Sequence, residues 1–340
     1  MFPAWTWIVG LFIGASIGSF LNALIYRMPR GLSISEPKNS FCPRCRARLT
    51  VLDLFPLLSW LFLRGKCRHC HAPISSRYFF IELFNGILFA AIWYQCLVLR
   101  EDPWRAVCLA IFMSALVAAI GTDLAHYIIP DQLNATMWFA GVTYNIGLIL
   151  QNDPKGWTWG MPSALAGWLV GAGLIWGIAL LGRLLFGKDA MGHGDIKMMR
   201  GIGAMLFPML TGFSLIIAVM CGMVVGIITI VARKAKPAAP EPETEDDDEE
   251  YVPESVGSLL KCGVGYFLLF DIVGLFFPKF YESYFGENPF AAEEIDENDE
   301  VSLTMIPFGP SLAVGAMIVV FFEPQVMRLY EGYLQFQGLK

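Results

Sequence analysis

The sequence Met191-Gly-His-Gly-Asp-Ile-Lys197 is a short, polar, glycine-rich break between two long apolar runs. It places a carboxylate, Asp195, at the end of a hydrophobic segment. An acid at that depth is costly unless it is paired or neutralised, so it is a candidate for function. A second acid, Asp123, follows another apolar run in a comparable position, shortly before Ile129-Pro-Asp131. We predict that Asp123 and Asp195 meet and share a proton.

The composition is that of a multi-spanning membrane protein. Of the 340 residues, 56% are hydrophobic and 16% are charged. Several apolar runs reach the roughly 20 residues that a helix needs to cross a bilayer, so we expect an all-α, polytopic membrane helix bundle of about eight spans. The first run, from Trp5 to Tyr26, has no basic segment before it and no small-residue cleavage site after it. We therefore interpret it as a retained helix.

The net charge of −6 combines two opposite populations. Residues 237–300 contain 18 acidic residues and two lysines, whereas basic residues are in excess in the rest of the chain. The tract 236–250 has the Pro-rich, acidic composition of a solvated linker. Elsewhere the basic residues flank apolar runs, where membrane topology accounts for them. We therefore expect membrane lipid, and no nucleic acid, as a partner.

Loop charge predicts the orientation of the chain. The connection 27–78 has ten Lys and Arg and two acidic residues, which assigns it to the cytoplasm by the positive-inside rule. Counting spans from this loop brings Asp123 and Asp195 to the cytoplasmic side at similar depth.

Two stretches of the second half do not fit one straight span each. The run from Met198 to Val231 is too long, and Pro208 and Gly212 predict a turn within it. The run from Leu259 to Phe277 is apolar but contains Asp271. It either spans the membrane or lies in the interface or re-enters, and we favour the second interpretation.

Four of the eight cysteines form two Cys-x-x-Cys pairs that are separated by 21 residues. Two such knuckles converge to make a tetrahedral zinc site. A pair of disulfides is the alternative, and it suits a reducing cytoplasm less well. We predict a structural zinc ion bound by Cys42, Cys45, Cys67 and Cys70.

These features divide the chain into five parts. The expected parts are a first span (1–26), a cytoplasmic zinc-knuckle module (27–78), a transmembrane core (79–232), an acidic insertion with an interfacial or re-entrant segment (233–305), and a last span with a tail (306–340).

The motifs follow one another in an order that carries family information. In the first third these are Gly18-Ser-Phe-Leu-Asn22 with Tyr26-Arg27, the two Cys-x-x-Cys pairs, Ser59-Trp60, Arg64-Gly-Lys-Cys67, and Ile74-Ser-Ser-Arg-Tyr78 with Glu82. Later come Asp123 with Ile129-Pro-Asp131, Gly192-His-Gly-Asp-Ile-Lys197, and Ile306-Pro-Phe-Gly-Pro310. This ordered set resembles the type IV prepilin peptidases, and the resemblance covers nearly the whole chain.

The resemblance implies a Gly-x-Gly-Asp-type aspartic endopeptidase of the bacterial inner membrane, active in type IV pilus or type II secretion systems. Its members remove the short basic leader of prepilins and pseudopilins at the cytoplasmic face. Many also methylate the new amino terminus with S-adenosylmethionine. The resemblance assigns Asp123 and Asp195 as the catalytic pair. The long acidic region 237–300 departs from the family pattern.

Other residues near the pair have supporting or structural interpretations. Gly192 and Gly194 let the backbone approach a substrate closely. We expect Lys197 to hold local charge or to extend toward lipid headgroups. Asp131 is interpreted as a structural acid at a helix N-terminus. The histidines next to the acids, His126 and His193, either tune them or lie at the interface.

Two alternatives remain open at this point. One is a peptidase that lacks methyltransferase activity. The other is not an enzyme but a zinc-knuckle membrane scaffold or a proton-coupled transporter.

Overall fold

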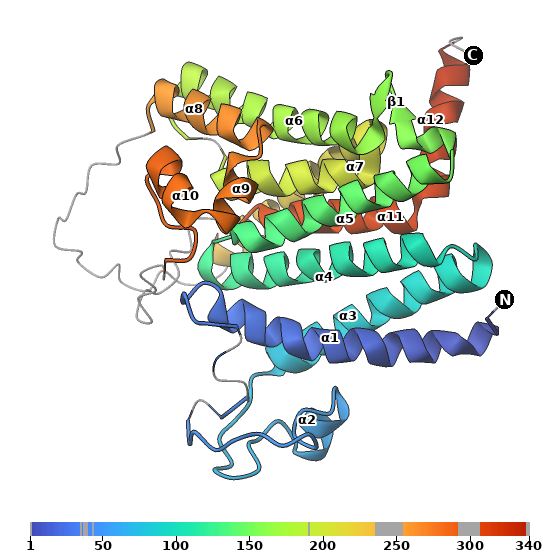
Figure 1. Ribbon diagram of the computed structural model, residues 1–340. Coiled ribbons are helices and arrows are strands. Elements are labelled where there is room, and N and C mark those ends of the chain that lie inside the picture. The colour runs from blue at the N-terminus through green and yellow to red at the C-terminus, as the bar shows by residue number, and fades with distance from the viewer. Residues whose placement is uncertain are drawn as a thin grey trace.

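The computed structural model describes residues 2–337 except 35, 37–39, 43, 190, 235–253 and 292–306. Long helices run side by side along one direction (Figure 1). They are α1 (Trp7–Arg27), α3 (Ser76–Ile92), α4 (Pro103–His126), α5 (Asp131–Leu150), α6 (Ser163–Phe186), α7 (His193–Lys234) and α11 (Gly309–Phe321). The expected linker 236–250 and the start of the last motif, Ile306, lie outside the described residues.

Shorter elements connect and cap these helices. They are η1 (Ala4–Thr6), α2 (Leu58–Phe62), the π-helical η2 (Trp93–Leu99), η3 (Pro154–Gly156), β1 (Trp157–Thr158), β2 (Met161–Pro162), α8 (Val256–Phe267), α9 (Phe270–Phe276), α10 (Pro278–Phe285) and α12 (Glu323–Phe336). Within the described residues, the strands are β1 and β2, and they form one antiparallel pair. The prediction of an all-α fold is confirmed.

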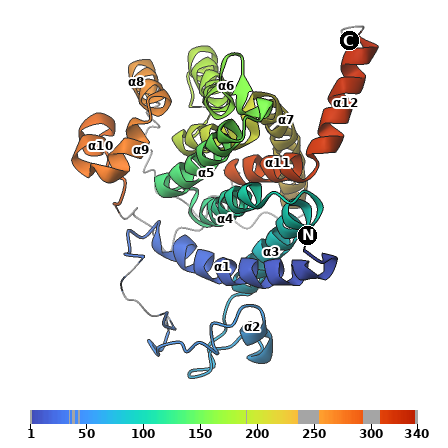
Figure 2. The ribbon, with the colours of Figure 1, turned by 45° about the vertical axis from the view of Figure 1, so that its right-hand side comes forward.

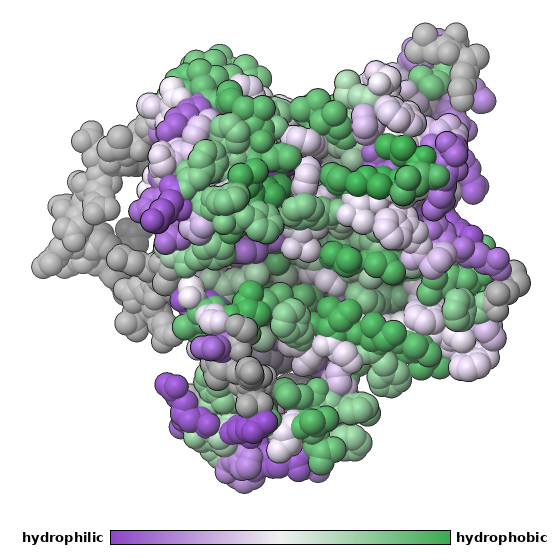
Figure 3. All heavy atoms as spheres, in the orientation of Figure 1, coloured by the Kyte–Doolittle hydropathy of each residue, from purple (hydrophilic) through white to green (hydrophobic). Residues whose placement is uncertain are grey.

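The bundle has the surface of a membrane protein. Within the part of the chain that the structure describes, five helices are long and apolar enough to cross a membrane, and two bent pairs, α8 with α9 and α11 with α12, also qualify if each is taken as one span. Large hydrophobic side chains are exposed along the helices. Figure 3 shows them covering the flank of the bundle, with hydrophilic residues toward its ends. Helix α5 lies outside the group of five; it runs among the others and buries Asn134 and Asn145.

Helix α7 is two helices joined at a break. It has 42 residues and would be about 63 Å long if it were straight, twice the roughly 30 Å of a bilayer core. Phe207, with φ 64° and ψ 171°, is not helical, and Pro208 follows it. The turn expected near Pro208 is therefore present one residue earlier.

The chain reverses at this break. Before it, α7 runs parallel to α5, which starts beside the end of α4. After it, α7 runs antiparallel to α11, which starts at that same end. The contacts that establish these directions are Gly201 with Met137, Gly141 with Ala204, Gly315 with Ser214, and Gly222 with Ser311.

Glycines allow the closest helix contacts in the bundle. A Cβ at Gly167 of α6 would lie 2.0 Å from the carbonyl oxygen of Gly203 in α7. In α1, a Cβ at Gly14 would lie 2.6 Å from the carbonyl oxygen of Asn85 in α3, and one at Gly18 would lie 2.7 Å from Cα of Glu82. These contacts bring backbones together as small residues do in membrane helix pairs.

The two predicted extramembrane regions lie apart from each other. The segment around α2 projects from the α1 and α3 side of the bundle, while α8, α9 and α10 pack at one end of α5, α6 and α7 (Figures 1 and 2). Helices α8 and α9 are bent by 70°. Arg183 at the end of α6 contacts Glu254 before α8, and Tyr281 of α10 contacts Asp131 at the start of α5. Both ends of the segment therefore lie at one end of the bundle, as a re-entrant or interfacial segment requires.

Candidate active site

The two predicted aspartates come from helix ends that meet. Asp123 lies in the last turn of α4, and Asp195 lies in the first turn of α7. The carboxylate of Asp123 accepts a hydrogen bond from the backbone N–H of Gly309, and that of Asp195 accepts one from Gly192. The two carboxylates are close enough for their charges to interact. The structure therefore brings the predicted pair together.

Ile129 joins the three motifs that form this site. Helix α4 ends at His126, the φ of 56° at Tyr127 turns the chain sharply, and the chain then leads through Pro130 into α5. The side chain of Ile129 is 8% exposed and contacts both Gly194 and Gly309. The loop after α4, the start of α7 and the start of α11 consequently pack on one residue.

Gly309 was not singled out by the sequence, although it lies in a recognised motif. A Cβ at this position would lie 2.5 Å from Oδ2 of Asp123 and 2.8 Å from Cδ1 of Ile129. Only glycine fits here without displacing the carboxylate. The available signal was its place between two prolines, in the sequence Pro307-Phe-Gly-Pro310.

The interpretation of Lys197 as a side chain that extends to lipid is wrong. Lys197 is 6% exposed, and its Nζ donates to both carboxylate oxygens of Asp131, at 2.7 and 2.9 Å. It also lies 5.0 to 5.8 Å from the ring centroids of Tyr266, Tyr281 and Phe285. The countercharge of Asp131 makes burial of this ammonium group possible. The carboxylate of Asp131 thus has the side chain of Lys197 as its partner, in addition to its place at the start of α5.

The two histidines have different surroundings. Nε2 of His193 lies 2.8 Å from Glu254, and its Nδ1 lies 3.0 Å from the hydroxyl of Tyr266. His126 lies 3.4 Å from Arg30 of the first loop. Each histidine therefore has a polar partner of its own.

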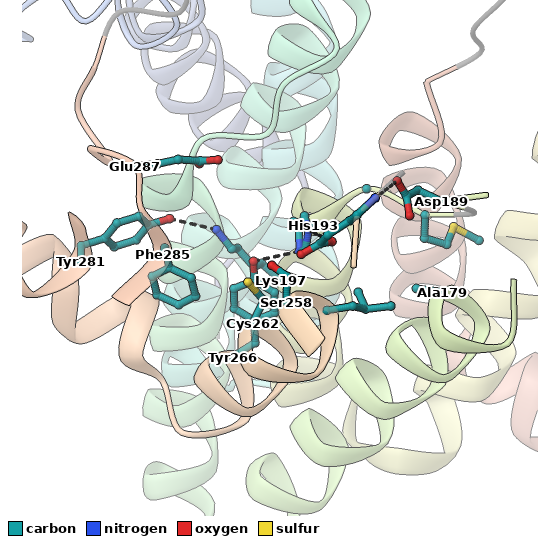
Figure 4. A pocket seen from close by; sticks show the side chains of 14 residues that line it. Ala179, Asp189, His193, Lys197, Ser258, Cys262, Tyr266, Tyr281, Phe285 and Glu287 are labelled. Carbon is teal, nitrogen blue, oxygen red and sulfur yellow. Dashed lines mark hydrogen bonds and ion pairs between the residues drawn. The ribbon is translucent and has the colours of Figure 1, made fainter. Parts of the chain in front are cut away.

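A cavity of about 500 Å³ adjoins the Gly-x-Gly-Asp loop. Figure 4 shows His193 and Lys197 of α7 facing Tyr266 and Tyr281 across it. Its wall is completed by residues of α6, of the following loop, of α8 and of α10, among them Ala179, Asp189, Ser258, Cys262, Phe285 and Glu287.

A buried ion pair beside this cavity was missed by sequence reasoning. Arg200 is 0% exposed and Asp271 is 1% exposed. The guanidinium donates to both oxygens of Asp271, at 2.8 and 2.7 Å, and to the carbonyl oxygen of Tyr266 at 2.9 Å. A single arginine and a single aspartate in two apolar runs were a signal, because charges at such depth pair with one another.

The four predicted metal ligands form a cluster. The sulfur atoms of Cys42, Cys45, Cys67 and Cys70 all lie within 4.8 Å of one another, and those of Cys42 and Cys70 are 3.9 Å apart. Sulfurs around a tetrahedral zinc ion with Zn–S bonds of about 2.3 Å lie roughly 3.8 Å apart. All four cysteines are free, so the disulfide alternative is wrong. The cluster can bind zinc.

The two knuckles share one backbone hydrogen bond and a positive φ at the residue after the second cysteine. The backbone carbonyl oxygen of Cys42 accepts a hydrogen bond from the N–H of Arg46 at 2.9 Å, and that of Cys67 accepts one from the N–H of His71 at 3.0 Å. Arg46 and His71 each have a positive φ, of 57° and 56°. The backbone N–H groups of Cys70 and then His69 donate to the thiol of Cys67 and lower its pKa to about 6. They favour the thiolate, which is the form that binds a metal.

Glu82 connects this module to the membrane helices. It is 8% exposed in α3 and accepts the backbone N–H of Leu57 at 2.8 Å. The ring of Trp60 lies 5.2 Å from that of Phe79 at the start of α3. The motif residues Trp60 and Glu82 therefore dock α2 on α3.

Comparisons with known proteins agree with this geometry. Residues 12–96 match the bacterial peptidase A24 N-terminal domain, and residues 110–227 match the type IV leader peptidase family. A prepilin leader peptidase/N-methyltransferase of Aeromonas hydrophila is 32% identical over 66% of this chain and 82% of its own length. The protein of the same name from Myxococcus xanthus (strain DK1622) is 31% identical over 93% of this chain and 90% of its own length. The chain belongs to the type IV leader peptidase family.

Within this leader peptidase, both aspartates fall in the range that matches the peptidase family, and the four cysteines fall in the range that matches the N-terminal domain. Helices α8, α9 and α10 lie outside both ranges. No solved structure gives a significant match to this chain.

Proposed function

We propose that this chain removes the leader peptide of type IV prepilins or pseudopilins, with Asp123 and Asp195 as its catalytic pair. The observation that carries the proposal is the meeting of the two carboxylates, from the end of α4 and the start of α7, with a backbone N–H donor on each. The names of the relatives support prepilins as the substrate class.

The chemistry needs one proton on the pair. Two carboxylates close together do not both ionise readily, so one stays protonated. The ionised carboxylate takes a proton from water as the water oxygen attacks the scissile carbonyl carbon. The protonated carboxylate donates to the carbonyl oxygen. As the peptide bond breaks, the carboxyl that took the proton from water gives it to the leaving amine, and the other carboxylate takes a proton from a hydroxyl of the tetrahedral intermediate, so the pair returns to its starting charge.

The remaining parts of the proposal concern the module and the membrane. Zinc bound by Cys42, Cys45, Cys67 and Cys70 holds the cytoplasmic module folded and takes no part in hydrolysis. S-adenosylmethionine is the methyl donor for the new amino terminus, a step supported by the relatives' names. The bacterial relatives support the inner membrane as the site, and loop charge supports cleavage at its cytoplasmic face.

The test is leader cleavage by the full chain in membranes, which is measured as a change in the gel mobility of a co-expressed prepilin. Asp123→Asn and Asp195→Asn should each abolish cleavage, because the remaining carboxyl group then has no second carboxyl group with which to share a proton. Cleavage that survives either substitution would favour a scaffold or transporter. Transfer of a labelled methyl group from S-adenosylmethionine to the cleaved product tests the second activity. An unlabelled product would mean that the chain is a peptidase without methyltransferase activity.

A further inference from the structure

The first turns of α7 present three basic side chains on one face. His193, Lys197 and Arg200 follow one another at i, i+4 and i+7, which aligns them on one side of a helix. Asp195 falls on the opposite side of the same turns. The helix that carries a catalytic aspartate therefore has a basic face on its other side, which needs polar partners from neighbouring elements.

Helices α8, α9 and α10 bind this basic side. The hydroxyl of Tyr266 lies 3.0 Å from His193, that of Tyr281 lies 3.2 Å from Lys197, and Asp271 pairs with Arg200. Figure 4 shows the two tyrosines approaching α7 from this segment. Each of the three basic residues has at least one partner there.

The pair of Asp271 with Arg200 is the most constrained of these contacts. Two parallel hydrogen bonds fix the guanidinium plane as well as its position, and a third goes to the carbonyl oxygen of Tyr266. Buried ion pairs of this kind contribute little net stability, but they can fix one packing arrangement over others. Here the arrangement fixed is the rotation and height of the first turns of α7.

The partners come from outside the matched family ranges. The peptidase match ends at residue 227, whereas α8 starts at Val256. The Aeromonas hydrophila relative aligns with 66% of this chain, against 93% for the Myxococcus xanthus relative. The segment thus lies outside the matched peptidase region and folds back onto α7, which begins inside it.

We propose that Asp271 and Tyr281 are positioning residues, which hold the start of α7 so that Asp195 faces Asp123. Asp271 acts through Arg200, and Tyr281 acts through Lys197 and Asp131. The inference rests on the proposed peptidase function. A displacement of about 1 Å at a catalytic group lowers the rate by about 100-fold, so a loosened helix reduces turnover without changing how the substrate is bound.

The experiment measures kcat, KM and thermal unfolding of the full chain in proteoliposomes, with a purified prepilin that the wild type cleaves. Asp271→Asn should lower kcat by at least about tenfold with KM within about twofold, since a contact that acts only through geometry affects turnover. Tyr281→Phe keeps the ring and should lower kcat by about three- to tenfold. If these contacts served only stability, the variants would change the unfolding temperature and not kcat.

The matched control is Glu323→Gln, which removes the ion pair with Arg105 at the other end of the bundle. It should lower the unfolding temperature and leave kcat unchanged. Folded Asp271→Asn and Tyr281→Phe proteins with wild-type kcat would overturn the proposal. If Asp271→Asn does not fold, Tyr281→Phe decides alone, and an unchanged kcat overturns it. Cleavage by Asp195→Asn would instead refute the peptidase assignment itself.

Discussion

Replacement of Gly309 by alanine tests the site geometry most directly. The added methyl group would lie 2.5 Å from Oδ2 of Asp123, and an ordinary contact begins at 3.4 Å. The carboxylate must therefore retreat by about 0.9 Å, the difference between these two separations. A misplacement of about 1 Å costs roughly 100-fold in rate, or about 2.7 kcal/mol of transition-state stabilisation. We expect Gly309→Ala to lower kcat by this factor.

The assay is leader cleavage by purified protein, with thermal unfolding measured in parallel. Gly315→Ala is the matched control, because it lies on the same helix and its Cβ would meet the carbonyl oxygen of Ser214 at 2.3 Å, away from the aspartates. It should be destabilised by about 1 to 3 kcal/mol, as overpacked sites are, with kcat per folded molecule retained. A Gly309→Ala protein with wild-type kcat would refute the geometry derived for Asp123.

Two further predictions concern the metal cluster and the helix core. Cys67→Ser should lower the zinc content, measured by atomic absorption, to background and expose the module to protease; Cys221→Ser should retain the metal, and zinc retention by Cys67→Ser would contradict a four-thiolate site. Gly167→Ala should lower the unfolding temperature by an amount that corresponds to about 1 to 3 kcal/mol, because its Cβ would overlap Gly203. Gly177→Ala, on the same helix with nothing within 4 Å, should not, and equal unfolding temperatures for the two variants would argue against the close contact of α6 with α7.

The aspartate pair and the cysteine cluster could be predicted because their signals are local. Hydrophobic runs and loop charge fix which helix ends share a side of the membrane, and Asp123 and Asp195 both follow from that count. The spacing within each Cys-x-x-Cys pair determines a knuckle almost by itself. Only the approach of the two knuckles is non-local, and it is the approach that the proposed zinc ion requires.

The partners of the buried basic residues could not be predicted in the same way. Asp131 is 66 positions from Lys197, and Asp271 is 71 positions from Arg200. An apolar run indicates that a helix is buried in lipid or protein, but it does not show which face meets which neighbour. Nearly uniform hydrophobicity around these helices removes the periodic signal that orients helices in soluble proteins. The right-angled packing of α12 on α11 was missed for a related reason, because a bend of 84° at Phe322 depends on packing rather than on composition.

The separation of Lys197 from the aspartates is a condition for the proposed chemistry. An ammonium group against Asp195 would stabilise its ionised form and oppose the sharing of a proton. The chain instead neutralises Lys197 with Asp131, and the donors to the carboxylates of Asp195 and Asp123 are the backbone N–H groups of Gly192 and Gly309. Helix ends supply such neutral donors without a side chain. A site built from helix ends can therefore satisfy two acids and still leave them able to hold one proton between them.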